Sequence, residues 1–292
     1  MDLGKVVMVT GASSGFGRLM VETLARKNYR VYATMRAVEG KNANAAGELR
    51  ELASKESLWI RILELDVTSE AAAERATAAA IEEAGQIDVL INNAGYGVMG
   101  IAEAVTTEQA QKLFDTNFFG AVRMNRAVLP QMRRQQSGLL MHISSGAGRL
   151  VFPAMGFYCA SKYALEALTE VYRYELAAQG IDSVSVEPGT YRTSVFNNIE
   201  RARDTARNDT YGPLSGLADR MLEQFSQVQS DPQEVADAVL EIIETPAGKR
   251  KLRYRVSVNG LAVDQINELS EKVQEQVLEA FGVAEITKFK LS

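Results

Sequence analysis

Short apolar runs typical of β-strands alternate with longer amphipathic segments along this chain, and no other feature limits its fold as strongly. The strand-like runs cover residues 6–9, 31–35, 58–65, 87–91, 139–143, 181–186 and a last run near 252–258. Helical patterns lie between them, as over 71–84, 108–132 and 158–178. Alternating strands and helices form βαβ units, and their right-handed crossovers produce a mostly parallel sheet. The pattern predicts an α/β fold with a doubly wound, seven-stranded sheet and helices on both faces.

We expect one domain over 1–292, because the chain shows no internal repeat, low-complexity linker or break in composition. The segment 193–229 fits no strand–helix repeat and follows the sixth strand. Ligands of doubly wound sheets bind beyond the carboxyl ends of the strands, so we interpret 193–229 as a substrate lid, with a plain surface excursion as the alternative. Residues 259–292 form a C-terminal extension, with an amphipathic helix expected over 262–281.

Charge and hydropathy exclude several classes of protein. The chain has 32 Lys and Arg against 37 Asp and Glu, a net charge of −5, which argues against a nucleic-acid partner. No apolar run reaches the roughly 18 residues that a membrane span needs, and no signal peptide is visible. A single cysteine allows no intrachain disulfide and fits a reducing compartment. We therefore expect a cytoplasmic protein.

The inventory of reactive side chains excludes two kinds of enzyme. The chain has one histidine, His142, and one cysteine, Cys159, too few for a zinc dehydrogenase. A Ser–His–Asp hydrolase of the α/β type needs a histidine late in the chain, and none follows His142. We interpret His142 as a packed strand residue and Cys159 as a packed helix residue.

A glycine-rich turn joins the first strand to the first helix, in the sequence TGASSGFG at 10–17. Glycine permits a tight turn and close approach of the backbone to a pyrophosphate, while the helix N-terminus offers free N–H groups. This position in a βα unit predicts a Rossmann-type dinucleotide site. The residues that we expect to bind the cofactor here are Gly11, Ser13, Ser14, Gly15, Phe16 and Gly17.

The end of the second strand bears on the choice of dinucleotide. An acidic residue there would bind a ribose 2′-hydroxyl, whereas an arginine would favour a 2′-phosphate. The sequence offers Arg36, whose guanidinium can bind phosphate through two hydrogen bonds. We therefore favour NADP(H) over NAD(H), although Glu39 lies nearby and Arg36 alone could be a solvated surface residue.

A tyrosine–lysine pair and a serine form the candidate catalytic group. Tyr158 and Lys162 are four residues apart and share one face of a predicted helix. An ammonium beside a phenol favours the phenolate, which makes the pair a workable acid and base for alcohol–carbonyl interconversion. Ser145 follows the fifth strand, where a hydroxyl would meet a ligand. Asn117 lies within an apolar helical segment and needs a polar partner there, or else bends the helix.

The chain resembles the short-chain dehydrogenase/reductase family in its single-domain branch. The resemblance rests on TGASSGFG, LDVT, NNAG, the Asn117 helix, ISSGAG, YCASK and EPGTYRT, in family order over about residues 5–193. Ser145 precedes Tyr158 by 13 positions, the spacing that the family uses. The YATMR stretch that ends at Arg36 resembles NADP-preferring members, which include 17β-hydroxysteroid dehydrogenase-like enzymes and carbonyl reductases.

The resemblance implies a role for each matched residue. Tyr158 would donate a proton to the carbonyl oxygen, Lys162 would bind the nicotinamide ribose, and Ser145 would hydrogen-bond the substrate. Asn117 would hold a water that links Lys162 to solvent. The further cofactor contacts that the resemblance implies are Asp66 at the adenine, Asn93 in the cleft, and Pro188, Gly189 and Thr193 at the nicotinamide.

Taken together, the sequence predicts an NADP(H)-dependent oxidoreductase that interconverts a carbonyl and an alcohol. The candidate pocket segments 96–99, 149–155 and 196–225 are mostly apolar, which favours a hydrophobic small-molecule substrate. An NAD-dependent alcohol dehydrogenase and a non-catalytic dinucleotide sensor stay open as alternatives. From the family resemblance we also expect a homodimer or homotetramer, assembled through the helices at about 108–132 and 158–178.

Overall fold

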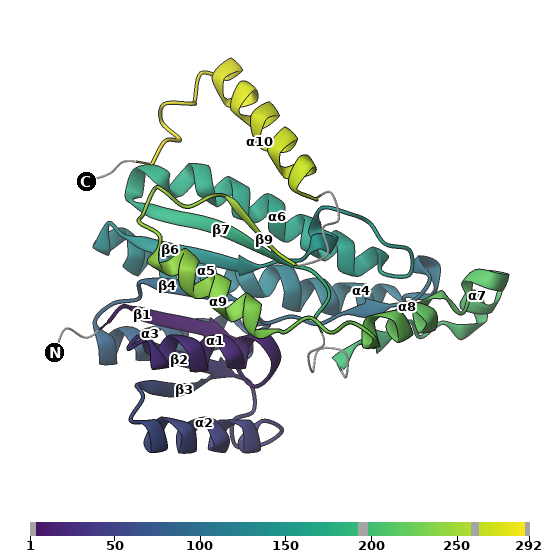
Figure 1. Cartoon of the computed structure of the whole chain (residues 1–292), viewed down its shortest axis with the longest axis horizontal. Coiled ribbons are helices and arrows are strands. Elements are labelled where there is room, and N and C mark those ends of the chain that lie inside the picture. The colour runs from purple at the N-terminus through teal and green to yellow at the C-terminus, as the bar shows by residue number, and fades with distance from the viewer. Residues whose placement is uncertain (1–3, 192–197, 258–262, 290–292) are drawn as a thin grey trace.

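Seven parallel strands form the central sheet of the computed structural model, which describes residues 4–191, 198–257 and 263–289 (Figure 1). The strand order is β3-β2-β1-β4-β6-β7-β9. The strands are β1 (Val6–Thr10), β2 (Arg30–Met35), β3 (Ile60–Glu64), β4 (Val89–Asn92), β6 (Gly138–Ile143), β7 (Ile181–Pro188) and β9 (Arg253–Val256). Every neighbouring pair is parallel. The predicted doubly wound, single-domain α/β fold is therefore confirmed.

Helices cover both faces of the sheet, and the two faces of β1 show how the cores divide. Val7 and Val9 point into one core with α1 (Gly15–Arg26), α2 (Ala43–Glu56) and α9 (Gln233–Glu244). Val6 and Met8 point into the other, with α3 (Glu70–Ala84), α5 (Gly120–Gln135) and the end of α6 (Gly156–Leu176). Burial on both faces explains why these strands are continuous apolar runs without polar alternation.

The strand order reverses between β1 and β4, and this reversal positions the site. From β1 the chain proceeds outward to β2 and β3, then returns to form β4 on the other side of β1. The helices that follow β1 and β4 diverge to opposite faces of the sheet, which leaves a crevice at the carboxyl ends of these strands.

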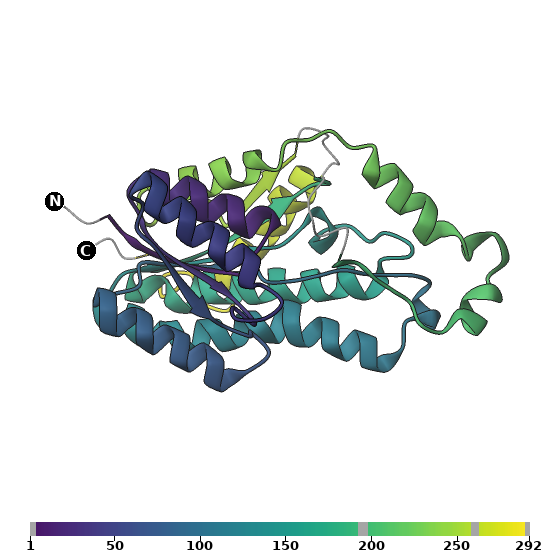
Figure 2. The same cartoon turned by 90° about the horizontal axis from the view of Figure 1, so that it is seen from below.

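A smaller layer projects beyond one end of the sheet (Figure 2). Its two-stranded parallel sheet pairs β5 (Val98–Met99) with β8 (Glu200–Arg201). The short helices α7 (Thr205–Asp209) and α8 (Leu217–Ser226) follow β8, and the Gln109 side chain of α4 (Thr107–Phe114) hydrogen-bonds the backbone of Arg201 and Arg203. The described part of 193–229 thus contains one short strand and two helices, although sequence periodicity showed neither.

Two other predicted helices differ from expectation in detail. The helix predicted over 108–132 consists of α4, a π-helical turn at Asp115–Phe119, and α5. The amphipathic tail forms α10 (Val263–Ala280), close to the predicted bounds. Among the described residues, no helix is long and apolar enough to cross a membrane.

Candidate active site

The glycine-rich turn leads directly into α1. Gly11 and Gly15 have φ angles of +68° and +55°, values that favour glycine. A Cβ atom at Gly17 would lie 2.3 Å from the carbonyl oxygen of Gly11, so only glycine fits. The N-cap residue Ser14 accepts no hydrogen bond from the first turn through its side chain. The first N–H groups of α1 therefore stay available for an anion, as a dinucleotide pyrophosphate requires.

Asn93, at the end of β4, braces this turn. Its side-chain nitrogen donates to the carbonyl oxygens of Thr10, at 2.8 Å, and Gly11, at 3.2 Å. Its backbone nitrogen donates to the Thr10 hydroxyl at 2.9 Å. The second asparagine of the NNAG motif is explained by these bonds, because its amide fixes the glycine-rich turn relative to strand β4.

A cavity of about 1430 Å³ lies along the carboxyl ends of the strands. Most of the residues predicted from the sequence line it: Gly11, Ser13, Ser14, Gly15, Phe16, Arg36, Asp66, Asn93, Ser145, Tyr158, Lys162, Pro188 and Gly189. Gly17 packs beneath the turn instead, and Asn117 lines a separate small cavity. Thr193 lies outside the described residues. One continuous cavity therefore brings together the two motif groups that the sequence separates by more than a hundred residues.

One end of the cavity carries basic side chains from the segment after β2. Arg36 is exposed at this end, and Lys41 and Asn42 line the cavity with it, whereas Glu39 does not. The Asn42 side chain donates to the carbonyl oxygen of Arg36 at 2.6 Å and holds the segment in place. Lys41 and Asn42 were missed by the sequence analysis, although a second basic residue shortly after Arg36 was a readable signal.

Asp66 lines the same end. Burial favours a raised pKa for its carboxyl, but hydrogen bonds from the Thr68 hydroxyl, at 2.7 Å, and the Thr68 backbone, at 2.9 Å, lower the pKa below its usual value. Asp66 is therefore an anion at neutral pH, available to accept a hydrogen bond.

Tyr158 and Lys162 lie one helical turn apart on α6, as the sequence predicted. The Lys162 ammonium donates to the carbonyl oxygen of Ile143 at 2.8 Å and lies 5.8 Å from the centre of the Tyr158 ring. Burial lowers the pKa of Lys162 to about 8, and the negative charge of Glu166 opposes this effect. Lys162 thus stays mostly charged at neutral pH, at the point where α6 faces the end of β6.

Ser145 hydrogen-bonds the Tyr158 side chain, and its hydroxyl also accepts from the backbone nitrogen of Ala147 at 3.1 Å. Burial raises the pKa of the Tyr158 phenol, and the bond with Ser145 acts in the opposite direction. The net direction is upward, so in the isolated chain the phenol keeps its proton at neutral pH. This is the form that can donate a proton to a carbonyl oxygen.

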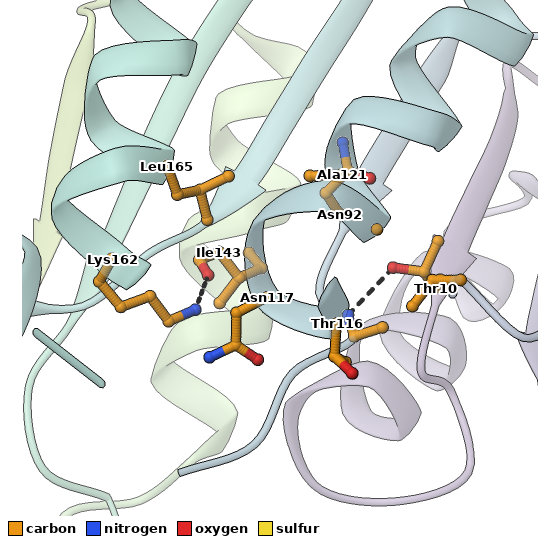
Figure 3. Close-up of a pocket in the computed structure, with 11 residues that line it drawn as sticks. Thr10, Asn92, Thr116, Asn117, Ala121, Ile143, Lys162 and Leu165 are labelled. Atoms are coloured by element: carbon orange, nitrogen blue, oxygen red, sulfur yellow. Dashed lines mark hydrogen bonds between the residues drawn. The ribbon is translucent and has the colours of Figure 1, made fainter. Parts of the chain in front are cut away.

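Asn117 has the polar partners that its apolar surroundings demand. Its side-chain oxygen accepts from the Tyr96 backbone nitrogen at 3.0 Å, and its nitrogen donates to the Tyr96 carbonyl at 2.9 Å and the Ser161 hydroxyl at 3.2 Å. Beside it lies a cavity of about 10 Å³, lined also by Thr10, Asn92 and Lys162 (Figure 3). That is about the space of one water molecule.

His142 and Cys159 lie in the protein interior, as expected of packed residues. His142 is fully buried, its Nε2 lies 3.0 Å from the Asn125 side-chain nitrogen, and burial lowers its pKa to about 3. Cys159 is a buried free cysteine. Within the described ranges, no group of histidine, cysteine and acidic residues could hold a metal ion.

The other end of the cavity is mostly apolar. Of the predicted pocket segments, all of 96–99 lines it, but 149–155 contributes only Phe152 and Met155. Arg149 is not part of the lining, and the lining adds Val228, beyond the predicted segments. Apolar side chains of α8, at Leu217, Met221 and Leu222, pack with Met99, Ala154 and Ile199. Of the described residues in 213–225, only Phe225 reaches the cavity.

Comparison with known proteins agrees with this geometry. The family model described as short chain dehydrogenase matches residues 5–204. A 3-ketodihydrosphingosine reductase of Bacteroides thetaiotaomicron is 33% identical over 239 residues, covering 82% of this chain and 83% of that protein. The 17-beta-hydroxysteroid dehydrogenase type 1 of Mus musculus is 33% identical over 258 residues, covering 85% and 72%.

A solved structure extends the likeness to the whole chain. A short-chain dehydrogenase from Streptomyces avermitilis superposes with a TM-score of 0.76 at 33% identity, covering 99% of this chain and all of that one. The likeness thus includes the sheet, the glycine-rich turn and the helix of Tyr158. The chain therefore belongs to the short-chain dehydrogenase/reductase family, the oxidoreductases that interconvert carbonyl and alcohol groups with a nicotinamide cofactor.

Proposed function

We propose that this protein is an NADP(H)-dependent reductase of hydrophobic ketones or aldehydes. One observation carries the proposal: Tyr158, Lys162 and Ser145 line the same cavity as the glycine-rich turn and Arg36. A dinucleotide whose pyrophosphate binds at the turn would therefore have its nicotinamide in the same cavity as the proton donor Tyr158. A sensor without turnover would have no use for a Tyr–Lys–Ser group in this position.

The residues of the cavity fit an extended dinucleotide. The uncapped first turn of α1 and the glycine cradle at Gly17 suit the pyrophosphate. Arg36 and Lys41 line the cavity and would provide two positive charges for a 2′-phosphate, and Asp66 would accept a hydrogen bond from the adenine. Pro188, Gly189 and, from the family resemblance, Thr193 would contact the nicotinamide. When bound, NADPH supplies the hydride to the carbonyl carbon.

The protein supplies the proton and the electrostatic setting. Tyr158 donates its phenolic proton to the carbonyl oxygen, and Ser145 hydrogen-bonds the same oxygen as negative charge develops on it. The Lys162 ammonium stabilises the phenolate that remains. A water in the small cavity beside Lys162 provides the route by which Tyr158 regains its proton. Asn117 lines that cavity, and its side-chain oxygen, which accepts one hydrogen bond from Tyr96, keeps a second lone pair with which it would hold this water.

The substrate end supports a bulky apolar carbonyl compound. Phe152, Met155, Ile199, Phe225 and Val228 all line it. The similar proteins named above are a reductase of a ketosphingoid base and a hydroxysteroid dehydrogenase, both named for large hydrophobic substrates. We assign the described part of 193–229 to a lid, because α8 packs its apolar side on β5 and Phe225 lines the cavity.

We also propose a dimer formed through the π turn at Asp115–Phe119 and helix α6, which packs on the sheet. Phe119, Tyr163 and Val171 are large apolar side chains on the π turn and α6, and each is more than a third exposed. A second copy that covers these helices would bury them. Light scattering at micromolar concentration should give twice the mass of the chain, and a monomer would contradict this part of the proposal.

The function is tested by NADPH oxidation, followed by absorbance, with a series of aliphatic and aromatic ketones and aldehydes of increasing size. We expect turnover with NADPH that rises with substrate hydrophobicity. Turnover with NADH alone would instead support an alcohol dehydrogenase of the NAD-dependent kind. Tight cofactor binding without turnover of any carbonyl or alcohol would support a sensor.

A further inference from the structure

A buried cluster of charged side chains lies along the catalytic helix α6, beyond Lys162 toward the C-terminal end of the helix. At its centre is Arg253 of β9, whose side chain is 2% exposed. Its Nε lies 3.1 Å from an oxygen of Glu166, and another guanidinium nitrogen lies 2.6 Å from an oxygen of Glu170. Both carboxylates belong to α6. Burying charged groups costs desolvation free energy, so a buried cluster beside the active site suggests a functional role.

Glu166 connects this cluster to the catalytic group. It lies four residues after Lys162 on α6, so the two side chains share a face of the helix. Its carboxylate also accepts a hydrogen bond from Ser185 of β7. A Cβ atom at Gly148 would lie 3.0 Å from Cγ of Glu166, so the stem of Glu166 packs against the turn that follows Ser145. A fixed negative charge therefore lies one helical turn from the Lys162 ammonium.

Glu166 pairs with Arg253, and several other ionisable groups lie around Glu166 and Lys162. Glu187 of β7 is buried, and burial together with the negative charge of Glu166 raises its pKa above its usual value. Facing the cluster from other elements are Arg149 after β6, and Asn267 and Glu271 of α10. His142 is neutral, and Tyr158 keeps its proton.

We propose that Glu166 is a positioning residue of the active site, which keeps Lys162 in its ammonium form by placing a buried negative charge one helical turn behind it. Arg253 and Ser185 hold the Glu166 carboxylate in place, and α10 closes the cluster from outside. The consequence for catalysis rests on the proposed function, whereas the effect on Lys162 itself does not.

Direct titration of Lys162 in the protein without cofactor tests this inference. In protein labelled with ¹³C-lysine, the Lys162 signal is identified by its loss in Lys162→Arg. We expect Glu166→Gln to lower the Lys162 pKa by about one pH unit, because the substitution removes a buried negative charge one helical turn away in a partly screened interior. Glu170→Gln is the matched control, since Glu170 lies on the same helix and pairs with the same arginine. It should leave the Lys162 pKa unchanged.

An unchanged Lys162 pKa in Glu166→Gln, or an equal decrease in Glu170→Gln, would overturn the inference. If Glu166→Gln does not fold, Glu166→Asp provides a second test. The shorter side chain keeps a negative charge to pair with Arg253 but moves that charge away from Lys162, so it should lower the Lys162 pKa by a smaller amount. A value equal to that of the wild type in Glu166→Asp would also contradict the inference.

The pH profile of ketone reduction separates this inference from the proposed function. If Lys162 must be charged, activity falls as pH rises through its pKa, and Glu166→Gln moves this fall to lower pH. A variant that is merely less stable would lose activity at every pH without a shift. If the wild type reduces no carbonyl compound, the proposed function fails, while the titration of Lys162 still decides the inference.

Discussion

The two ends of the cavity differ in how they are built. The nucleotide end consists of strand ends and the first turn of α1, held by hydrogen bonds such as those that the Asn93 side chain donates to the carbonyl oxygens of Thr10 and Gly11. The substrate end consists of short elements from separate parts of the chain, including β5, β8 and α8, which meet through apolar side chains. The first end is fixed by glycine geometry and the sheet, whereas the second depends on packing that many apolar sequences could provide.

The most severe test of the catalytic group, which lies between the two ends, is Tyr158→Phe. Loss of the phenolic hydroxyl removes the proton donor, so we expect the rate of ketone reduction to fall by about 10²- to 10⁴-fold. NADPH binding, followed by fluorescence, should change little because the ring remains in place. A variant that reduces ketones at the wild-type rate would rule out the mechanism.

Gly17→Ala should disrupt the nucleotide end. The added Cβ would meet the Gly11 carbonyl at 2.3 Å, and we expect a loss of about 1–3 kcal/mol of stability together with loss of cofactor binding. Gly47→Ala is the control, because Gly47 lies in α2 with no atom within 4 Å of the added Cβ. Thermal unfolding should show that Gly47→Ala is as stable as the wild type or slightly more. Equal effects of the two substitutions would contradict the account of the turn.

Arg36→Ala separates the two dinucleotides at the same end. Loss of a charged hydrogen-bond donor to the 2′-phosphate should weaken NADPH binding roughly 10- to 100-fold and leave NADH binding unchanged. Glu39→Gln serves as the comparison, since Glu39 does not line the cavity. Equal losses of affinity for NADPH and NADH would show that Arg36 stabilises the segment after β2 and does not bind the 2′-phosphate.

At the substrate end the expected effects are smaller. Phe225→Ala should raise KM for bulky ketones by roughly tenfold and leave KM for small ketones nearly unchanged, because part of an apolar wall is lost. Leu214→Ala is the control, as Leu214 is half exposed and lies outside the cavity lining. If both variants behave like the wild type, the segment is not a lid.

The same contrast explains what the sequence could predict. Gly11, Asn93, Ser145 and Tyr158 occupy strand ends and helix starts, where the chemistry of a turn or a helix face restricts the residue type. The fold followed from the alternation of strands and helices, and the described motif residues line the cavity or lie beside it.

The rest depended on tertiary contacts that leave little periodic signal. The strand β8 has two residues and exists through its pairing with β5. The π turn at Asn117 interrupts a helix whose apolar pattern looks continuous in sequence, because the amide bonds to Tyr96 and Ser161. Glu166 is buried because β7, β9 and α6 meet around it, and these contacts leave no signal in the sequence.

The measurement that tests the central claim most directly is titration of the purified wild-type protein with NADPH and with NADH, followed by the fluorescence of the bound nicotinamide. Tight binding of NADPH with much weaker binding of NADH is the predicted result, because Arg36 and Lys41 both line the end of the cavity where we propose that the 2′-phosphate binds. Preference for NADH, or binding of neither cofactor, would contradict the claim that this protein is an NADP(H)-dependent reductase.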